Sequence, residues 1–227
     1  MRQRAVIRVL ATALALGGGC TADRAVMRPT DPKKGTGFVT IFDGTSLDGW
    51  EIYIEPPREA RPDAFFLENS TLACKGYGYH WFRYREPLGD CVVRLEFRCA
   101  KDTNSGVCLR SRKDGAPPFT GFEVQILDDI GKDPHKHSTG AIYDVVTPMY
   151  NASRPLGEWN ELEITCKGPL VQVVVNGLKV IDTDFSRLTS PIGKFDFPYS
   201  ALPRTGYLAL QDHWTPIWYR NIRLKRL

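Results

Sequence analysis

The stretch LVQVVVNGLKVI, residues 170–181, carries the clearest structural signal in this chain. Two runs rich in β-branched residues, Val171–Val175 and Leu178–Ile181, flank the dipeptide Asn176-Gly177. Asn-Gly favours the two-residue turn that joins antiparallel strands, because both residues adopt positive φ angles at little cost. We therefore expect a β-hairpin here.

Short apolar-alternating runs of the same kind recur from Phe38 to the C-terminus, with turn residues between them. Besides the hairpin, these runs are GFVTIF, CVVRLEFRC, SGVCLRS, GFEVQIL, NELEITCKG, GYLALQDH and IWYRNIRL. After residue 20 no segment of helical length keeps a 3.6-residue period, and residues 186–203, interrupted by Pro and Ser, predict a long loop. Many short strands without long helices indicate an all-β sandwich or barrel.

The charge balance argues against one class of partner. The 227 residues carry 30 Lys and Arg against 26 Asp and Glu, a formal net charge of +4. Three of the positive charges, Arg2, Arg4 and Arg8, lie within the first eight residues, so the rest of the chain is close to neutral. Nucleic-acid-binding domains usually present a clustered basic face, and we expect no nucleic-acid partner.

The first 20 residues resemble an export signal, with a positive start, a short apolar stretch and small residues before Cys20. The apolar stretch is too short to span a bilayer comfortably. A run ending in Cys also resembles a lipoprotein signal, so we expect a periplasmic or outer-membrane (cell-surface) lipoprotein that touches the membrane only through a lipid anchor; ordinary cleavage nearby is the alternative. Residues 21–37 are polar and predict a linker, which leaves 38–227 as the folded domain.

Alternation along three of the expected strands separates an apolar stripe from a polar one. In 104–110, 122–128 and 208–214 the apolar residues fall on one face. The polar residues on the opposite faces are Asn104, Arg110, Glu123, Gln125, Gln211 and His213. A solvated sheet face is one explanation. Amides, Arg and His next to aromatic residues also suit sugar hydroxyls, and these residue types favour a ligand-binding face.

The polar stripes do not contain an obvious pair of catalytic carboxylates. Conventional glycosidases hold two carboxyl groups about 5–9.5 Å apart, whereas the position beside Glu123 on its stripe is Gln125. Asp128 and Asp129 are adjacent on a strand and point to opposite faces, so one of them would cap a turn or bind a metal. Asp212 remains as a distant partner, and His213 beside it is a candidate acid or base.

Several segments, taken in order, resemble the 3-keto-disaccharide hydrolase domain family. They are IFDGTSLDGW (41–50), LEFR (95–98), NSGV (104–107), GFEVQILD (121–128), TGAIY (139–143), GEWN (157–160), NG (176–177), LQDH (210–213) and YRNIR (219–223). The ordered match covers residues 38–227, essentially the whole expected domain.

The resemblance implies a concanavalin A-like jelly-roll sandwich of two antiparallel sheets with a concave ligand face. It also implies an enzyme that cleaves the glycosidic bond of 3-keto glycosides or disaccharides, by elimination and hydration or by hydrolysis. A ketone at C3 acidifies the C2 proton, so elimination needs a general base rather than a carboxylate pair. The alternatives are a non-catalytic, lectin-like carbohydrate-binding module and a structural surface protein.

Within this resemblance we assign a role to each candidate residue. Glu123 or His213 would be the base, and Asp128 and Asp212 would orient groups or bind a divalent metal ion, the one cofactor that the chemistry leaves room for. The expected substrate-binding residues are Asn104, Arg110, Gln125, Tyr143 and Gln211. The expected partner is a carbohydrate, and the oligomeric state stays open.

Overall fold

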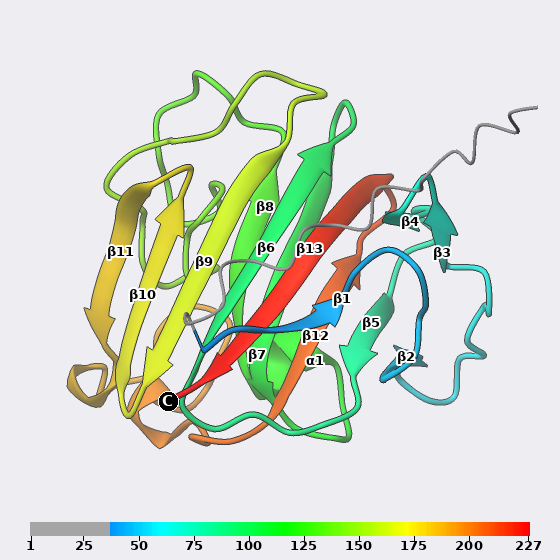
Figure 1. The fold of residues 1–227 in the computed structure, drawn as a ribbon. Helices are drawn as coiled ribbons and strands as arrows, with labels where there is room; N and C mark the ends of the chain where they lie inside the picture. The colour runs from blue at the N-terminus through cyan, green and yellow to red at the C-terminus, as the bar shows by residue number, and fades with distance from the viewer. Residues whose placement is uncertain (1–36) are drawn as a thin grey trace, which may run out of the picture. The chain divides into compact units, whose positions relative to one another are not determined.

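A computed structural model of the chain describes residues 37–227. Within that range the chain forms two antiparallel sheets that pack against each other, which confirms the expected jelly-roll sandwich. Figure 1 shows the sheets face to face. The expected export signal (1–20) and all but the last residue of the expected linker (21–37) lie outside the described residues.

The larger sheet has eight strands within residues 37–227, in the order β11-β10-β9-β6-β13-β4-β3, with β1 also paired to β13. Its strands are β1 (Val39–Phe42), β3 (Phe65–Glu68), β4 (Thr71–Cys74), β6 (Cys91–Cys99), β9 (Asn160–Lys167), β10 (Leu170–Val175), β11 (Leu178–Asp184) and β13 (Ile217–Arg226). The expected hairpin is confirmed: Val175 lies opposite Leu178, and the turn residues Asn176 and Gly177 have φ angles of +49° and +81°.

The smaller sheet has five strands in the described part of the chain, in the order β2-β5-β12-β7-β8. Its strands are β2 (Trp50–Ile54), β5 (His80–Tyr84), β7 (Asn104–Ser111), β8 (Phe122–Leu127) and β12 (Tyr207–Asp212). The remaining elements are the short helix α1 (Pro117–Thr120) and the 3-10 turns η1 (Phe185–Arg187) and η2 (Tyr199–Ala201). No helix within residues 37–227 is long and apolar enough to cross a membrane.

The apolar stripes predicted from alternation form the core between the sheets. Val124 and Ile126 of β8 and Leu210 of β12 are fully buried in the main core cluster. A polar contact also ties the sheets together, because the Ser105 hydroxyl lies 2.7 Å from the Tyr219 hydroxyl of β13. The smaller sheet is thereby held with its polar stripes turned away from the core.

The sheet face predicted for Arg110 is wrong. Across β12 and β7, Tyr207 pairs with Ser111 but Ala209 pairs with Cys108, so β7 holds one residue more than its partner over this interval. Arg110 lies in this bulge with a φ angle of +56°. A β-bulge interrupts the two-residue alternation of side chains, so Arg110 leaves the face that simple alternation assigned to it.

The Arg110 guanidinium instead lies buried beneath the sheet, with only 2% of the residue exposed. Its Nη2 donates to the Gly168 carbonyl at 2.8 Å and lies 3.5 Å from Asp90 Oδ1. These partners flank the ends of β9 and β6, so Arg110 links the two sheets. Arg110 does not line the cavity described below, and we withdraw it as a substrate-binding residue.

The expected long loop over residues 186–203 is confirmed, apart from its 3-10 turns. Phe185 and Tyr199 anchor its two ends in the core, with their ring centroids 5.2 Å apart in an edge-to-face contact. Phe185 also meets Phe122 of β8 at 5.2 Å. The loop is therefore packed along the edge of the smaller sheet, on the side where β8 lies.

Candidate functional site

A cavity of about 420 Å³ lies on the outward face of the five-stranded sheet. This volume falls within the range of ligand pockets, about 300–1,000 Å³. Its lining residues are Glu55, Arg58, Tyr79, Trp81, Asn104, Ala116, Pro118, Phe119, Glu123, Gln125, Tyr143, Lys194, Gln211, Asp212 and His213. The lining combines aromatic walls with convergent polar groups, the usual make-up of a small-molecule site.

The register of the sheet explains how the polar side chains converge. Glu123 of β8 lies opposite Cys108 of β7, and Gln125 lies opposite Gly106. Cys108 in turn packs with Trp81 and Ala209 in a small apolar cluster separate from the main core. This cluster forms an apolar floor beside the polar residues of the edge strand β8.

Glu123 is a buried carboxylate in the lining of the cavity. Only 3% of the residue is exposed. A methyl group at Gly106 would lie 2.2 Å from Glu123 Oε1 and 2.8 Å from its Cγ, so the side chain occupies the space that a bare glycine leaves. The absence of a side chain at Gly106 therefore sets the position of the carboxylate.

Burial raises the pKa of Glu123 above its ordinary value, because desolvation disfavours the charged form. Lys194, His213 and the Gln211 side chain oppose this rise, with Lys194 as the largest opposing influence. The opposition is incomplete, and the pKa stays raised. A carboxyl group with a pKa moved toward neutrality is suited to accept and release a proton near neutral pH.

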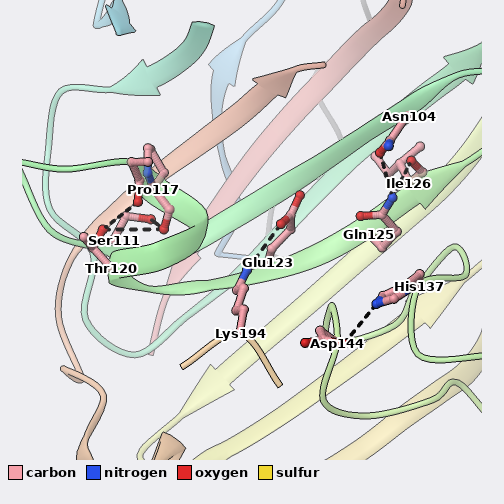
Figure 2. Close-up of polar contacts among 11 residues, drawn as sticks. Asn104, Ser111, Pro117, Thr120, Glu123, Gln125, Ile126, His137, Asp144 and Lys194 are labelled. Atoms are coloured by element: carbon pink, nitrogen blue, oxygen red, sulfur yellow. Dashed lines mark hydrogen bonds and ion pairs between the residues drawn. The ribbon is translucent and has the colours of Figure 1, made fainter. Parts of the chain in front are cut away.

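Lys194 reaches the site from the long loop between β11 and β12. Its Nζ lies 3.4 Å from Glu123 Oε2, and both side chains are more than 90% buried. Figure 2 shows the two side chains pointing toward each other from β8 and from the loop. Sequence reasoning missed this residue, because a loop has no alternation that would indicate the direction of a side chain.

Two polar atoms around the cavity are buried and have no hydrogen-bond partner among the described residues: Gln125 Oε1 and Trp81 Nε1. The other end of the Gln125 amide donates to Asn104 Oδ1 at 2.9 Å, which holds its orientation (Figure 2). Buried polar groups in folded proteins are nearly always satisfied. One acceptor and one donor are thus left to be satisfied by a polar ligand or by water.

Tyr143 forms one wall of the cavity. Its ring stacks on His137 with centroids 4.7 Å apart, and His137 Nε2 lies 3.0 Å from Asp144 Oδ1. The backbone N–H of Tyr143 donates to the carbonyl of Glu123 at 2.9 Å. Burial, with the Glu123 charge second, raises the pKa of the Tyr143 hydroxyl. Tyr143 is therefore a neutral, well-positioned wall next to the carboxylate.

His213 follows β12 and lies at the mouth of the cavity, where it is partly exposed. Next to it, Tyr79 and Trp214 meet edge to face at 5.4 Å, and the Arg58 guanidinium lies 4.5 Å from the Tyr79 ring centroid. Tyr79 and Trp214 are 41% and 57% exposed. The mouth therefore offers an aromatic surface of the kind on which sugar rings stack.

Asp212 lines the cavity, but its carboxylate is already engaged by the backbone. Oδ2 accepts from Tyr77 N–H at 3.0 Å, and Oδ1 accepts from Gly78 N–H at 2.9 Å. His80 Nδ1 lies 3.7 Å from Oδ2 and 2.9 Å from the Gly78 carbonyl. These contacts fix the loop that carries Tyr79, so Asp212 supports the mouth of the cavity.

Replacing Asp212 by Asn is expected to destabilise the protein by about 1–3 kcal/mol, because an amide nitrogen would face a buried backbone N–H. The change should lower Tm in a thermal melt, with the exposed Asp133→Asn as the matched control. A Tm equal to that of the wild type would contradict the structural role of Asp212.

The two carboxylates expected to bind a metal do not come together. Asp128 does not line the cavity. Its Oδ2 accepts from the Asp102 N–H at 3.0 Å, in the turn between β6 and β7 rather than in the turn that follows Asp128. Within residues 37–227 no group of three His, Cys, Asp or Glu side chains is arranged to hold a metal ion. The described residues therefore do not fit the metal site that we expected from Asp128 and Asp212.

The structure brings together most of the residues expected from the sequence. Those that line the cavity are Asn104, Glu123, Gln125, Tyr143, Gln211, Asp212 and His213. Arg110 and Asp128 lie elsewhere. The lining residues that sequence reasoning did not assign to the site lie mainly in the loops around it, such as Glu55, Arg58 and Lys194, and in the short helix α1, such as Phe119.

Comparisons with known proteins agree with this architecture. A curated 3-keto-disaccharide hydrolase from Bacteroides thetaiotaomicron is 25% identical, over 86% of this chain and 80% of its own length. A provisionally named glycosyl hydrolase from Parabacteroides distasonis superposes with a TM-score of 0.72 at 24% identity, over 84% of this chain and 99% of that one.

A β-glucanase from Bacillus licheniformis shares the fold more distantly, with a TM-score of 0.50 and 12% identity over 86% of this chain and all of its own. The model of one protein family matches residues 37–225, nearly the whole described range. The chain belongs to the family of 3-keto-alpha-glucoside-1,2-lyase-like domains.

Proposed function

We propose that this protein cleaves the glycosidic bond of 3-keto glycosides by elimination, with Glu123 as the general base. The observation that carries the proposal is that Glu123, a buried carboxylate with a raised pKa, faces a sugar-sized cavity. Burial also raises the pKa of Asp212, the other buried carboxylate of the lining, but both of its oxygens accept backbone hydrogen bonds. The curated relative from Bacteroides thetaiotaomicron, named a 3-keto-disaccharide hydrolase, supports the same substrate class.

A conventional glycosidase uses two carboxyl groups at a set separation, and the other carboxylates of the cavity lining, Asp212 and Glu55, differ from Glu123 in their surroundings. Asp212 uses both oxygens to accept backbone hydrogen bonds. Glu55 follows β2, which lies at the opposite edge of the sheet from β8. A mechanism that needs one base is therefore a better match to the site than one that needs two carboxylates.

In the proposed reaction, the C3 ketone makes the C2 proton acidic. Glu123 takes that proton, the C2–H electrons form the C1=C2 double bond, and the C1–O bond to the leaving group breaks. The departing oxygen takes a proton, which His213 in the cavity lining would donate. Addition of water to the double bond would complete a net hydrolysis.

Binding of the sugar would use the groups that the protein leaves unsatisfied. Gln125 Oε1 would accept from a sugar hydroxyl, and Trp81 Nε1 would donate to a sugar oxygen. Gln211 also lines the cavity, next to Trp81. Its strand, β12, lies between β5, which carries Trp81, and β7, which carries Gly106. The Tyr79 and Trp214 rings would contact the part of the substrate at the mouth.

The experiment that tests this function is incubation of the folded domain with a 3-keto disaccharide and with its unoxidised parent, with and without a chelator. The expected result is that the sugar of the leaving group is released from the keto disaccharide and not from its unoxidised parent. Binding without release would favour the lectin-like alternative, and equal release from both sugars would contradict elimination. Loss of release in chelator would show a metal requirement.

The raised pKa of Glu123 predicts the acid side of the pH profile. The base works only when ionised, so kcat/KM for the keto substrate should fall as the pH drops through the pKa of Glu123. That pKa is raised from the ordinary value of 4.5, and the midpoint of the fall should lie above 4.5. A measured kcat/KM that stays level down to pH 4.5 would be inconsistent with a buried Glu123 base.

A further inference from the structure

Lys194 is a buried cation that the proposed reaction has not yet used. Its side chain is 8% exposed, and it lines the cavity beside Glu123. Burying an ammonium group is costly unless it is paired. A positive charge at this position faces a cavity in which negative charge would develop on the substrate.

Three aromatic rings surround the Lys194 ammonium. Its Nζ lies 5.0 Å from the ring centroid of Tyr143, 5.6 Å from that of Phe119 and 5.7 Å from that of Phe195. Each ring face attracts a cation within about 6 Å. The rings therefore make favourable contacts with the ammonium and restrict where the nitrogen can move.

The pairing with Glu123 leaves room for another partner. The distance from Lys194 Nζ to Glu123 Oε2 is 3.4 Å. A tight charge-assisted hydrogen bond between such groups measures about 2.7–2.9 Å. An ammonium has three N–H donors, and Glu123 is the one hydrogen-bond acceptor recorded for it within residues 37–227. At least one donor is available to an oxygen atom of a ligand in the cavity.

The backbone next to Lys194 is shaped for a close approach to the wall of the site. Gly193 has a φ angle of +66°, and a methyl group there would lie 2.6 Å from the Asp144 carbonyl oxygen. Asp144 directly follows Tyr143, one of the three rings around the ammonium. The glycine thus lets the loop bring Lys194 against the wall that Tyr143 forms.

We propose that the Lys194 ammonium binds the C3 carbonyl oxygen of the keto sugar and stabilises the negative charge that develops there. This role rests on the proposed function. As Glu123 removes the C2 proton, the C2–H electron pair moves toward C3 and the carbonyl π pair moves onto its oxygen. When the C1–O bond breaks, an electron pair on the oxygen re-forms the C3 carbonyl and the C2=C3 pair becomes the C1=C2 bond. Lys194 keeps its proton throughout.

The surroundings of Lys194 separate this role from covalent catalysis. An imine with the ketone would need the neutral amine, whose lone pair attacks C3. The aromatic rings and the carboxylate are instead favourable partners for a cation. Treatment of the enzyme and keto sugar with borohydride should therefore leave Lys194 unmodified in a peptide mass map.

The test compares Lys194→Met with Lys136→Met, an exposed lysine near the same wall. Because Lys194 lowers the pKa of Glu123, kcat is compared at the maximum of each protein's own pH profile rather than at one fixed pH. Lys194→Met is expected to lose about 10²–10³-fold in kcat, the usual effect of removing one donor to a developing oxyanion. Lys136→Met should match the wild type.

Two further measurements distinguish a catalytic from a structural role. Binding of the unoxidised parent sugar, which has no ketone, should change little in Lys194→Met, and Lys194→Arg should retain more activity than Lys194→Met. An inactive wild type would overturn the proposed function itself. An active wild type with an equally active Lys194→Met, or with a borohydride-trapped Lys194, would overturn this inference alone.

Discussion

Glu123→Gln is expected to lower kcat for the 3-keto substrate by about 10²–10⁴-fold, the range attributed to a positioned general base. Gln has nearly the same shape as Glu and would still occupy the space above Gly106. It lacks the basicity needed to take the C2 proton. The measurement is steady-state release of the second sugar, alongside a circular dichroism spectrum to show that the variant is folded.

The control for this substitution is Glu161→Gln, an exposed glutamate on β9 of the larger sheet. It makes the same chemical change far from the cavity lining, and its activity should equal that of the wild type. If folded Glu123→Gln kept more than a tenth of the activity, another group would have to be the base. His213, the alternative candidate, would then be the first residue to replace.

Gly106→Ala is expected to reduce kcat by on the order of 10²-fold, although alanine is a small and apolar residue. The new methyl group would lie 2.2 Å from Glu123 Oε1 and 2.8 Å from Cγ, so the carboxylate must move. Displacement of a catalytic group by about 1 Å can cost on the order of 10²-fold in rate. Overpacking of this kind also costs about 1–3 kcal/mol of stability.

The matched control is Gly89→Ala, where the added methyl group would meet nothing closer than Thr205 Oγ1 at 3.7 Å. Neither glycine has a positive φ angle, so the two variants differ in local space rather than in backbone strain. Full activity in folded Gly106→Ala would mean that Glu123 works equally well from another position, against the geometry proposed for the site.

Much of the fold was predictable because its signals are local. The Asn176-Gly177 turn and the alternation in residues 122–127 depend on neighbours in the chain, and the structure confirms both. The strand His80–Tyr84 was not predicted. Its polar residues, His80 and Arg83, are three positions apart, so its sequence shows no two-residue alternation.

The candidate site was predictable only where alternation holds. Glu123 and Gln125 follow the two-residue period of a regular strand and reach the cavity. Arg110 belongs to the same pattern, but a single extra residue in β7 moved it to the other side. Lys194 comes from a loop whose path depends on contacts with residues 50 positions away, such as Asp144.

The measurement that tests the central claim most directly is the fate of the C2 hydrogen. A 3-keto disaccharide carrying deuterium at C2 is cleaved in ordinary water, and the product is analysed by mass spectrometry, with enzyme-free buffer as the control for spontaneous exchange. Elimination with Glu123 as base predicts loss of the deuterium from the product. A product that keeps its C2 deuterium would show direct hydrolysis and contradict the proposed mechanism.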